Sequence, residues 1–198
     1  MPATDHTHTA MLSLFSHPVR YDRLTNRVFG RLHRRIAADV AAAGLAPGSR
    51  VLDVGTGPGR VPLAIAAVAG QLAVDGLDVS PRMIEHARHA AAEAGLADRV
   101  GFVVGDVADL PYPESTFDLI VSSMSQHHWS NPRAGLRELH RVLRPGAQVW
   151  IYDARPALPR ATAAARAAFP ARAVRREPVR MGRLPITFTG RLIAQRPA

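Results

Sequence analysis

The chain of 198 residues contains no cysteine and no lysine. The lack of cysteine excludes disulfides, thiolate metal ligands and cysteine nucleophiles. No apolar run approaches the ~20 residues of a membrane-spanning helix, and the first residues have neither the basic start nor the apolar core of a secretory signal. We therefore expect a cytoplasmic protein without a membrane span and without a metal site.

Because lysine is absent, all 25 basic residues are arginine, and the formal net charge is +9. The excess is uneven, since ten arginines and one acid, Glu177, follow from Arg155 to the C-terminus. A basic segment can bind nucleic acid through its phosphates. It can equally be a solvated face in a protein whose gene is rich in G and C, and the abundant alanine favours this second interpretation.

The length and the 47% hydrophobic composition suit one domain with a full core. Residues 1–20 are polar and predict a flexible tail. Apolar residues then recur every fourth position from Leu24 to Val40, which predicts a helix over residues 21–43. We expect residues 21–45 to form an N-terminal capping segment and residues 46–198 the cofactor-binding core of a single domain, 21–198.

Strands and helices alternate from residue 51 onward. Strands are predicted at 51–54, 73–78, 100–104, 117–121 and 148–152, and the third and fourth are apolar enough for burial on both faces. Helices are predicted after the first strand and at 82–94, 132–143 and 160–169. Two closely joined strands, 173–181 and 186–194, must pair antiparallel, with a turn near 183–185. The fold class is therefore α/β: a doubly wound, Rossmann-like, mostly parallel sheet of about seven strands, with helices on both faces and an antiparallel last hairpin.

The most informative segment is Val51-Leu-Asp-Val-Gly-Thr-Gly-Pro-Gly-Arg60. A buried strand breaks into three glycines and opens a helix, so a ligand can approach bare main chain near a helix N-terminus. A dinucleotide fingerprint requires glycine at position 60, where this chain has arginine. The segment predicts a nucleotide-type site and argues against a nicotinamide dehydrogenase.

Ligands of such sheets bind at the carboxyl ends of the strands. Those ends carry Asp53, Asp78 in Gly76-Leu-Asp-Val-Ser80, Asp106 in Gly105-Asp-Val-Ala-Asp-Leu-Pro111, and Ser123 in Phe117-Asp-Leu-Ile-Val-Ser-Ser123. A helix and turn follow in Leu136-Arg-Glu-Leu-His-Arg-Val-Leu-Arg-Pro-Gly146. In this order and spacing the segments resemble the class I S-adenosylmethionine-dependent methyltransferases, from about Tyr21 to the C-terminus.

The resemblance implies S-adenosylmethionine as cofactor and assigns roles to individual residues. Asp78 is expected to hold the ribose hydroxyls and Asp106 the adenine amine, with Val107 and Met83 against the ring. The methionine moiety is expected to lie on the main chain of Gly55 and Gly57. Its amino group is expected to contact the backbone near Ser123, and Asp53 through a water molecule. The expected cofactor-binding set is Asp53, Gly55, Thr56, Gly57, Asp78, Val79, Met83, Asp106, Val107, Ser123 and Tyr21. The alternatives are structural: an acid that bonds loop N–H groups for Asp53, a turn former for Asp106 and a core residue for Met83.

The acceptor side is expected at Gln126-His127-His128-Trp129, directly after the fourth strand. His127 is the candidate catalytic base, because histidine titrates near neutral pH. Methyl transfer relies mainly on orientation, however, and related proteins carry histidine here without catalytic duty. Trp129 either lines the pocket or packs.

Residues 15–36 are similar to the N-terminal helix of the quinone-biosynthesis C-methyltransferases, where Tyr21 is a candidate cofactor lid with ordinary helix packing as its alternative. That similarity fades after the fourth strand. We expect methyl transfer to a small-molecule acceptor, with an RNA methyltransferase or a non-catalytic S-adenosylmethionine-binding accessory subunit as alternatives. Nucleic acid is not the expected partner, and a homodimer is left open.

Overall fold

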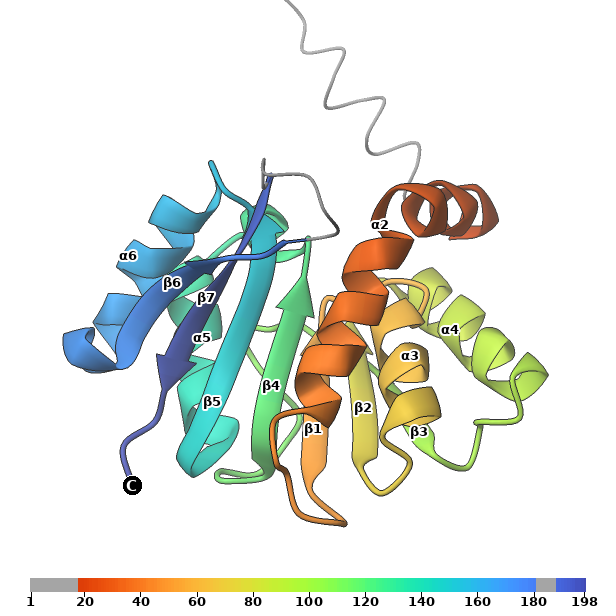
Figure 1. Cartoon of the computed structure of the whole chain (residues 1–198), viewed down its shortest axis with the longest axis horizontal. Helices are drawn as coiled ribbons and strands as arrows, with labels where there is room; N and C mark the ends of the chain where they lie inside the picture. The colour runs from red at the N-terminus through yellow and green to blue at the C-terminus, as the bar shows by residue number, and fades with distance from the viewer. Residues whose placement is uncertain (1–17, 181–187) are drawn as a thin grey trace, which may run out of the picture.

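The computed structural model describes residues 18–180 and 188–198, with side chains from Phe29 onward. Within these residues one sheet has the strand order β3-β2-β1-β4-β5-β7-β6 (Figure 1). Its strands are β1 (Arg50–Val54), β2 (Ala73–Asp78), β3 (Val100–Val104), β4 (Phe117–Ser123), β5 (Leu143–Ala154), β6 (Val174–Pro178) and β7 (Thr189–Gln195). β7 runs antiparallel to both of its neighbours, β5 and β6, and the other pairings in this sheet are parallel. The predicted sheet and its antiparallel last hairpin are confirmed.

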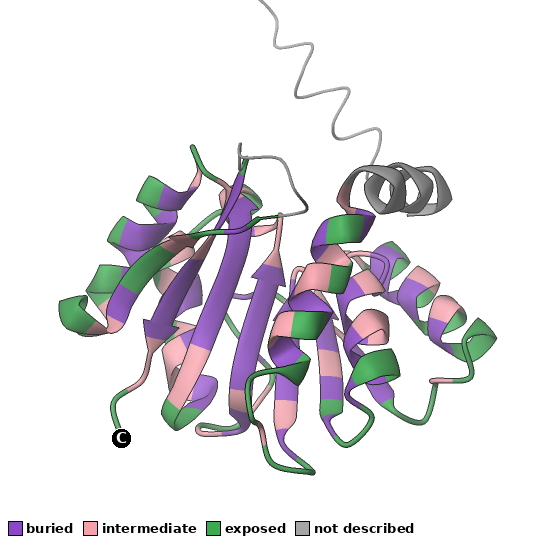
Figure 2. Cartoon of the chain, in the orientation of Figure 1, coloured by how far each residue is buried: buried purple, intermediate pink, exposed green. Residues whose placement is uncertain are grey.

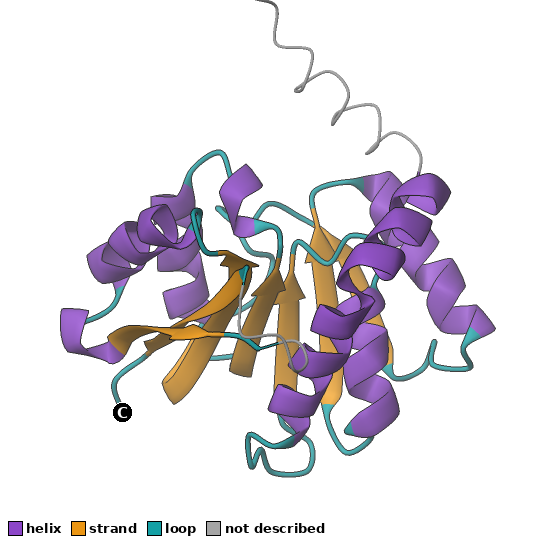
Figure 3. Cartoon of the chain, turned by 45° about the horizontal axis from the view of Figure 1, so that its top comes forward, coloured by secondary structure: helices purple, strands orange, loops and turns teal. Residues whose placement is uncertain are grey.

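Helices cover both faces of this sheet, as Figure 3 shows. They are α2 (Pro18–Ala41), α3 (Arg60–Val68), α4 (Pro81–Glu93), α5 (Pro132–Val142) and α6 (Leu158–Ala168), with short 3₁₀ helices η1 (Gln126–His128) and η2 (Ala171–Ala173). One core joins α2 and α3 to the sheet through Leu32, Ile36 and Ile65. The core on the opposite face contains Leu136 and Leu139 of α5. The chain is therefore doubly wound, as predicted.

Local chemistry explains where two of these helices begin. The Ser80 hydroxyl accepts a hydrogen bond from the Met83 N–H at the start of α4, and the Asn131 side chain accepts one from the Ala134 N–H at the start of α5. In each case proline follows the cap at the first helical position, where its missing N–H costs nothing. These caps fix the point at which the chain leaves β2 and the turn after β4.

Two details of the predicted strands are wrong. β3 is not buried on both faces, because it is the edge strand of the sheet and Gly101 and Val104 are exposed. The α5 helix stops at Val142, and β5 begins at once and runs through the Pro145-Gly146 pair that we expected to be a turn. The Gly146 N–H donates to the Arg196 carbonyl oxygen at 3.0 Å, so pairing with the end of the chain extends this strand.

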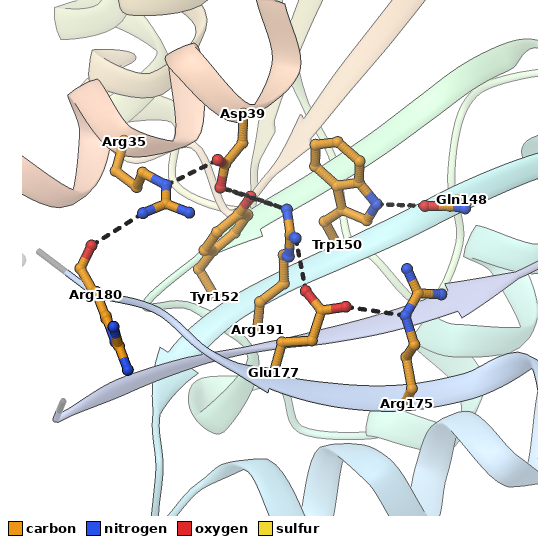
Figure 4. A network of polar contacts seen from close by, with 9 residues as sticks. All are labelled: Arg35, Asp39, Gln148, Trp150, Tyr152, Arg175, Glu177, Arg180 and Arg191. Atoms are coloured by element: carbon orange, nitrogen blue, oxygen red, sulfur yellow. Dashed lines mark hydrogen bonds and ion pairs between the residues drawn. The ribbon is translucent and has the colours of Figure 1, made fainter. Parts of the chain in front are cut away.

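Helix α2 is tied to the far half of the sheet by a polar network (Figure 4). The Tyr152 hydroxyl donates to Asp39 Oδ2 at 2.9 Å, and Arg191 binds that hydroxyl at 3.1 Å and Glu177 Oε2 at 2.7 Å. The Arg191 guanidinium also lies 4.8 Å from the Trp150 ring centroid. One arginine thus links β5, β6, β7 and α2, and its charge is used inside the protein.

Figure 2 shows that the strands of the sheet are largely buried, whereas the outer faces of the helices are exposed. None of the helices in the described part of the chain combines the length and the apolar character that crossing a bilayer requires. The expected tail, residues 1–20, lies almost wholly outside the described residues, and so does the turn expected near 183–185. The division into tail, capping segment and core stays a prediction.

Candidate active site

The candidate site lies at the carboxyl ends of the parallel strands. β1 pairs with β2 on one side and with β4 on the other, so successive connections leave β1 in opposite directions. Such a switch point leaves a crevice above the sheet, where ligands of open α/β folds bind. The segments after β1, β2 and β4 meet at this point.

The glycine loop is held close to the turn that follows β4. The N–H groups of Gly55 and Thr56 both donate to the Leu77 carbonyl oxygen, at 2.8 and 3.0 Å. Gly55 has φ +71°, and a Cβ placed on it would lie 1.8 Å from Ser125 Oγ. Gly57 also has positive φ, at 53°. Glycine is required at Gly55 both by the backbone conformation and by the approach of Ser125.

Asp53 is a buried carboxyl group without a hydrogen-bond partner among the described residues. Its side chain is 1% exposed, and neither carboxyl oxygen accepts a hydrogen bond. Burial raises the pKa of Asp53 to about 7; the nearby Thr56 hydroxyl partly offsets this rise without reaching hydrogen-bonding geometry, and the Asp78 charge adds to it. An unpaired buried carboxylate is costly. The alternative that Asp53 bonds loop N–H groups is not what the structure shows.

Asp78 is already engaged with the glycine loop. Its Oδ2 accepts a hydrogen bond from the Gly57 N–H at 2.8 Å, and its Oδ1 accepts one from the Ser80 N–H at 2.9 Å. Burial raises the pKa of Asp78, and these two N–H groups partly offset the effect. A carboxylate offers about four acceptor positions, so Asp78 can hold the loop and still accept from two hydroxyls.

The residues expected near an adenine ring differ in exposure. Val79 is 69% exposed beside Asp78, whereas Met83 is 2% exposed and Val107 is buried in the α5 and α6 core. Asp106 is exposed, and its Oδ1 accepts a hydrogen bond from the Ala108 N–H at 2.9 Å. In this structure Met83 is thus a core residue and Asp106 a turn former, as the structural alternatives proposed. A second role in ligand binding stays a prediction for both.

Several other buried polar atoms around the β1 and β4 ends have no partner among the described residues. They are Thr56 Oγ1, Ser122 Oγ, Ser123 Oγ and both amide atoms of Gln126. Buried polar groups are normally hydrogen-bonded, so this concentration indicates a site that is completed by a polar ligand or by water. The Tyr21 side chain lies outside the described residues, and its role stays a prediction.

The segment that we expect to face the acceptor takes part in a pair that the sequence analysis missed. His127 Nδ1 lies 2.9 Å from both carboxyl oxygens of Asp153, at the end of β5. Asp153 is fully buried, and its Oδ1 also accepts from the Ala154 N–H at 2.7 Å. Trp129 donates to Ser125 Oγ at 3.1 Å, so Trp129 fastens the same turn. The neglected signal is an acid directly after the apolar run at 148–152, the feature that singled out Asp78.

Comparison with known proteins agrees with this geometry. Residues 51–146, from β1 to the start of β5, match the family described as "Methyltransferase domain". The chain carries a class I S-adenosylmethionine-dependent methyltransferase domain. The predicted family and fold are confirmed, and S-adenosylmethionine is the cofactor that the domain implies.

Two curated relatives and one solved structure show how far the similarity extends. The chain is 35% identical to the 27-O-demethylrifamycin SV methyltransferase of Amycolatopsis mediterranei, over 66% of this chain and 44% of that protein. It is 37% identical to a ubiquinone/menaquinone biosynthesis C-methyltransferase of Geotalea daltonii, over 68% of this chain and 58% of that protein. A putative S-adenosyl-L-methionine-dependent methyltransferase from Methanococcus maripaludis has a TM-score of 0.72 at 21% identity, and the match covers 93% of this chain and 94% of that one. The chain thus spans about half the length of these curated relatives.

Proposed function

We propose that this chain transfers the methyl group of S-adenosylmethionine to a small-molecule acceptor. The observation that carries the proposal is the buried Asp53 carboxyl group, which has no partner among the described residues and lies beside the glycine loop and Asp78, at the strand ends of a methyltransferase domain. Both curated relatives are named for methyl transfer to small molecules, one at oxygen and one at carbon. Their names therefore support the acceptor class and leave the methylated atom open.

The residues present fit the cofactor. A cationic amino group of the ligand suits the Asp53 carboxylate and the backbone near Ser123. A flexible chain of the ligand suits the bare main chain of Gly55 and Gly57. Asp78 retains acceptor capacity for ribose hydroxyls, with Val79 as apolar surface beside it. The remaining assignments, Thr56, Met83, Asp106, Val107 and Tyr21, are part of the same proposal.

When bound, S-adenosylmethionine supplies a sulfonium methyl group, and its carbon–sulfur bond breaks as the acceptor's new bond to that carbon forms. The protein's contribution is chiefly orientation. Gly55 lies against Ser125, two residues before His127. The acceptor is thus expected beside η1, close to the glycine loop.

The arginine-rich segment gives little support to the RNA alternative. Arg191 is used in the network with Tyr152 and Glu177, and Arg196 donates to the Leu143 carbonyl oxygen at 2.6 Å. These two charges stabilise the sheet. A cytoplasmic location and a homodimer stay predictions.

Calorimetric titration tests the proposal. We expect S-adenosylmethionine and S-adenosylhomocysteine to bind with micromolar affinity and NAD to give no heat of binding. A folded chain that binds neither sulfur compound contradicts the proposal and favours an accessory subunit that requires a partner. Binding without transfer to any acceptor would also favour the accessory role.

A further inference from the structure

The turn after β4 is rigidly defined, and it carries His127. Met124 has φ +51°, a left-handed backbone conformation that is uncommon for residues other than glycine. Its N–H donates to the Tyr152 carbonyl oxygen at 2.8 Å, and Trp129 holds Ser125 from the other end. Local strain of this kind persists only where surrounding contacts fix it, and it concentrates at functional sites.

The His127–Asp153 contact determines which ring nitrogen carries the proton. An ionised carboxylate only accepts hydrogen bonds. With Asp153 ionised, Nδ1 therefore holds the hydrogen, because it faces both oxygens of Asp153 at 2.9 Å. In the neutral ring the lone pair is then on Nε2, which makes no hydrogen bond to any described residue. The His127 side chain is 30% exposed, so this nitrogen belongs to a ring that is not sealed in the core.

We propose that Asp153 is a positioning residue that holds His127 as a general base for a phenolic or enolic hydroxyl acceptor. This inference rests on the proposed function. The acceptor O–H bond breaks as its proton passes to Nε2, and the electron pair stays on the oxygen that is methylated. The imidazolium then carries a proton on each nitrogen beside the Asp153 carboxylate, and it releases the Nε2 proton to solvent after transfer.

One chemical argument and one observation favour a hydroxyl on an aromatic or similarly flat acceptor. A neutral hydroxyl oxygen is a weak nucleophile that requires a base, whereas a neutral amine already presents its lone pair. Apolar surface is also available at the same edge of the sheet. Phe188 is 77% exposed, and its carbonyl oxygen accepts a hydrogen bond from the Arg155 N–H, two residues beyond Asp153.

The first test reads the tautomer and needs no acceptor. In protein labelled with ¹⁵N-histidine, NMR should show neutral His127 with its hydrogen on Nδ1, assigned by loss of the signal in His127→Gln. Asp153→Asn should shift the hydrogen to Nε2, because the carboxamide NH₂ can donate to Nδ1. A wild-type ring protonated on Nε2, or an unchanged tautomer in Asp153→Asn, overturns the positioning role.

Two control variants separate this effect from general disturbance. Glu93→Gln removes the acid beside His89 in an exposed pair on α4. His128→Gln removes the ring that lies 4.0 Å from the His127 ring. Neither should change the His127 tautomer. Among the described residues, Asp153 and His128 are the titratable groups placed against this imidazole, and Asp153→Asn and His128→Gln change each of them in turn.

The second test measures transfer to p-nitrophenol, phenol and p-methoxyphenol. Asp153→Asn and His127→Gln should each lower kcat/KM at neutral pH about 100-fold or more, with S-adenosylhomocysteine affinity unchanged. The loss should be smallest for p-nitrophenol, the most acidic of the three, and should shrink as pH rises. Transfer to amines or carbon acceptors but to none of the phenols overturns the acceptor class. Failure of wild-type protein to bind S-adenosylmethionine would instead contradict the proposed function and leave the tautomer result standing.

Discussion

The two halves of the site are built differently. On the cofactor side, at the ends of β1 and β2, the contacts are made largely by backbone groups: the N–H groups of Gly55, Thr56 and Gly57 bind Leu77 and Asp78. On the acceptor side, at the ends of β4 and β5, side chains bind side chains: His127 to Asp153, and Trp129 to Ser125. The first half needs glycines and one acid at fixed spacing, so it is visible in the sequence. The second depends on the register between strands.

This difference has a functional consequence. A cofactor shared by many proteins can be held by main chain, whose geometry changes little with sequence. Acceptors vary, and the side chains of the β4–β5 half can vary with them. The matched methyltransferase domain ends at residue 146, before Asp153 and Phe188. Substitutions in the two halves should therefore have separable effects on cofactor binding and on transfer.

The largest expected effect concerns Asp53. Since burial raises its folded-state pKa to about 7, the folded protein binds this proton more tightly than the unfolded chain does. The free energy of unfolding should then fall as pH rises from about 4 to about 7. Asp53→Asn removes this penalty and should be more stable than wild type by up to about 4 kcal/mol at pH 8, with the difference shrinking toward pH 4. Guanidinium unfolding of both proteins across this range measures it.

An exposed carboxyl supplies the control for Asp53. Asp98→Asn, at an exposed turn position, should give no comparable gain at pH 8. Asp78 is present both in the wild-type protein and in the Asp53→Asn variant, and its electrostatic coupling to Asp53 is part of the stability difference that this pair of proteins measures. An Asp53→Asn protein that is less stable than wild type at pH 8 would show that the carboxylate is stabilised by contacts absent from this structure.

Gly55→Ala should lower stability by roughly 2–4 kcal/mol, through positive φ and overlap with Ser125. Gly48→Ala is the matched control: Gly48 has φ +82° and nothing within 4 Å of an added Cβ, so it reports the backbone strain alone, about 1–2 kcal/mol. Thermal unfolding gives both values. The second change Ser125→Gly should recover part of the Gly55→Ala loss, and no recovery would mean that Ser125 is not the obstacle.

The sequence predicted which residues meet at the ends of β1 and β2, and it did so for a physical reason. The bounds of β2 and β3 are as predicted, and Asp53, Gly55 and Asp78 do meet at one edge. Periodicity and glycine spacing are local properties, and parallel strands align their carboxyl ends. The closeness of Ser125 to Gly55, and of Asp153 to His127 across 26 positions, depends on the β1–β4 and β4–β5 registers. No local pattern encodes the order in which strands lie side by side or the register between them, and the missing strand order explains why the edge position of β3 was missed.

Asp78→Ala should weaken S-adenosylhomocysteine binding by roughly 1–3 kcal/mol. Comparing S-adenosylhomocysteine with 5′-methylthioadenosine distinguishes the role of Asp78 from that of Asp53. 5′-Methylthioadenosine retains the ribose and adenine but lacks the amino acid part. Asp78→Ala should weaken both ligands equally, whereas Asp53→Asn should weaken only S-adenosylhomocysteine. Calorimetry at pH 8 on proteins confirmed as folded measures these affinities. Unchanged binding of both ligands by Asp78→Ala would reduce Asp78 to an anchor for the glycine loop.

The smallest effects are expected from substitutions of the two tryptophans of the chain, which are equally buried and can be compared directly. Trp129 donates to Ser125 beside the glycine loop, and Trp150 donates to Gln148 and lies under Arg191. Each change to phenylalanine removes one hydrogen bond, which costs about 1 kcal/mol of stability; Trp150→Phe should also weaken the contact with Arg191. Only Trp129→Phe should weaken S-adenosylhomocysteine binding, because it frees Ser125, and only Trp129 should change its fluorescence when the ligand binds. Equal effects of both substitutions on affinity would mean that the two halves of the sheet are coupled through β5. The backbone contacts on the cofactor side would then not determine ligand affinity independently of the other half.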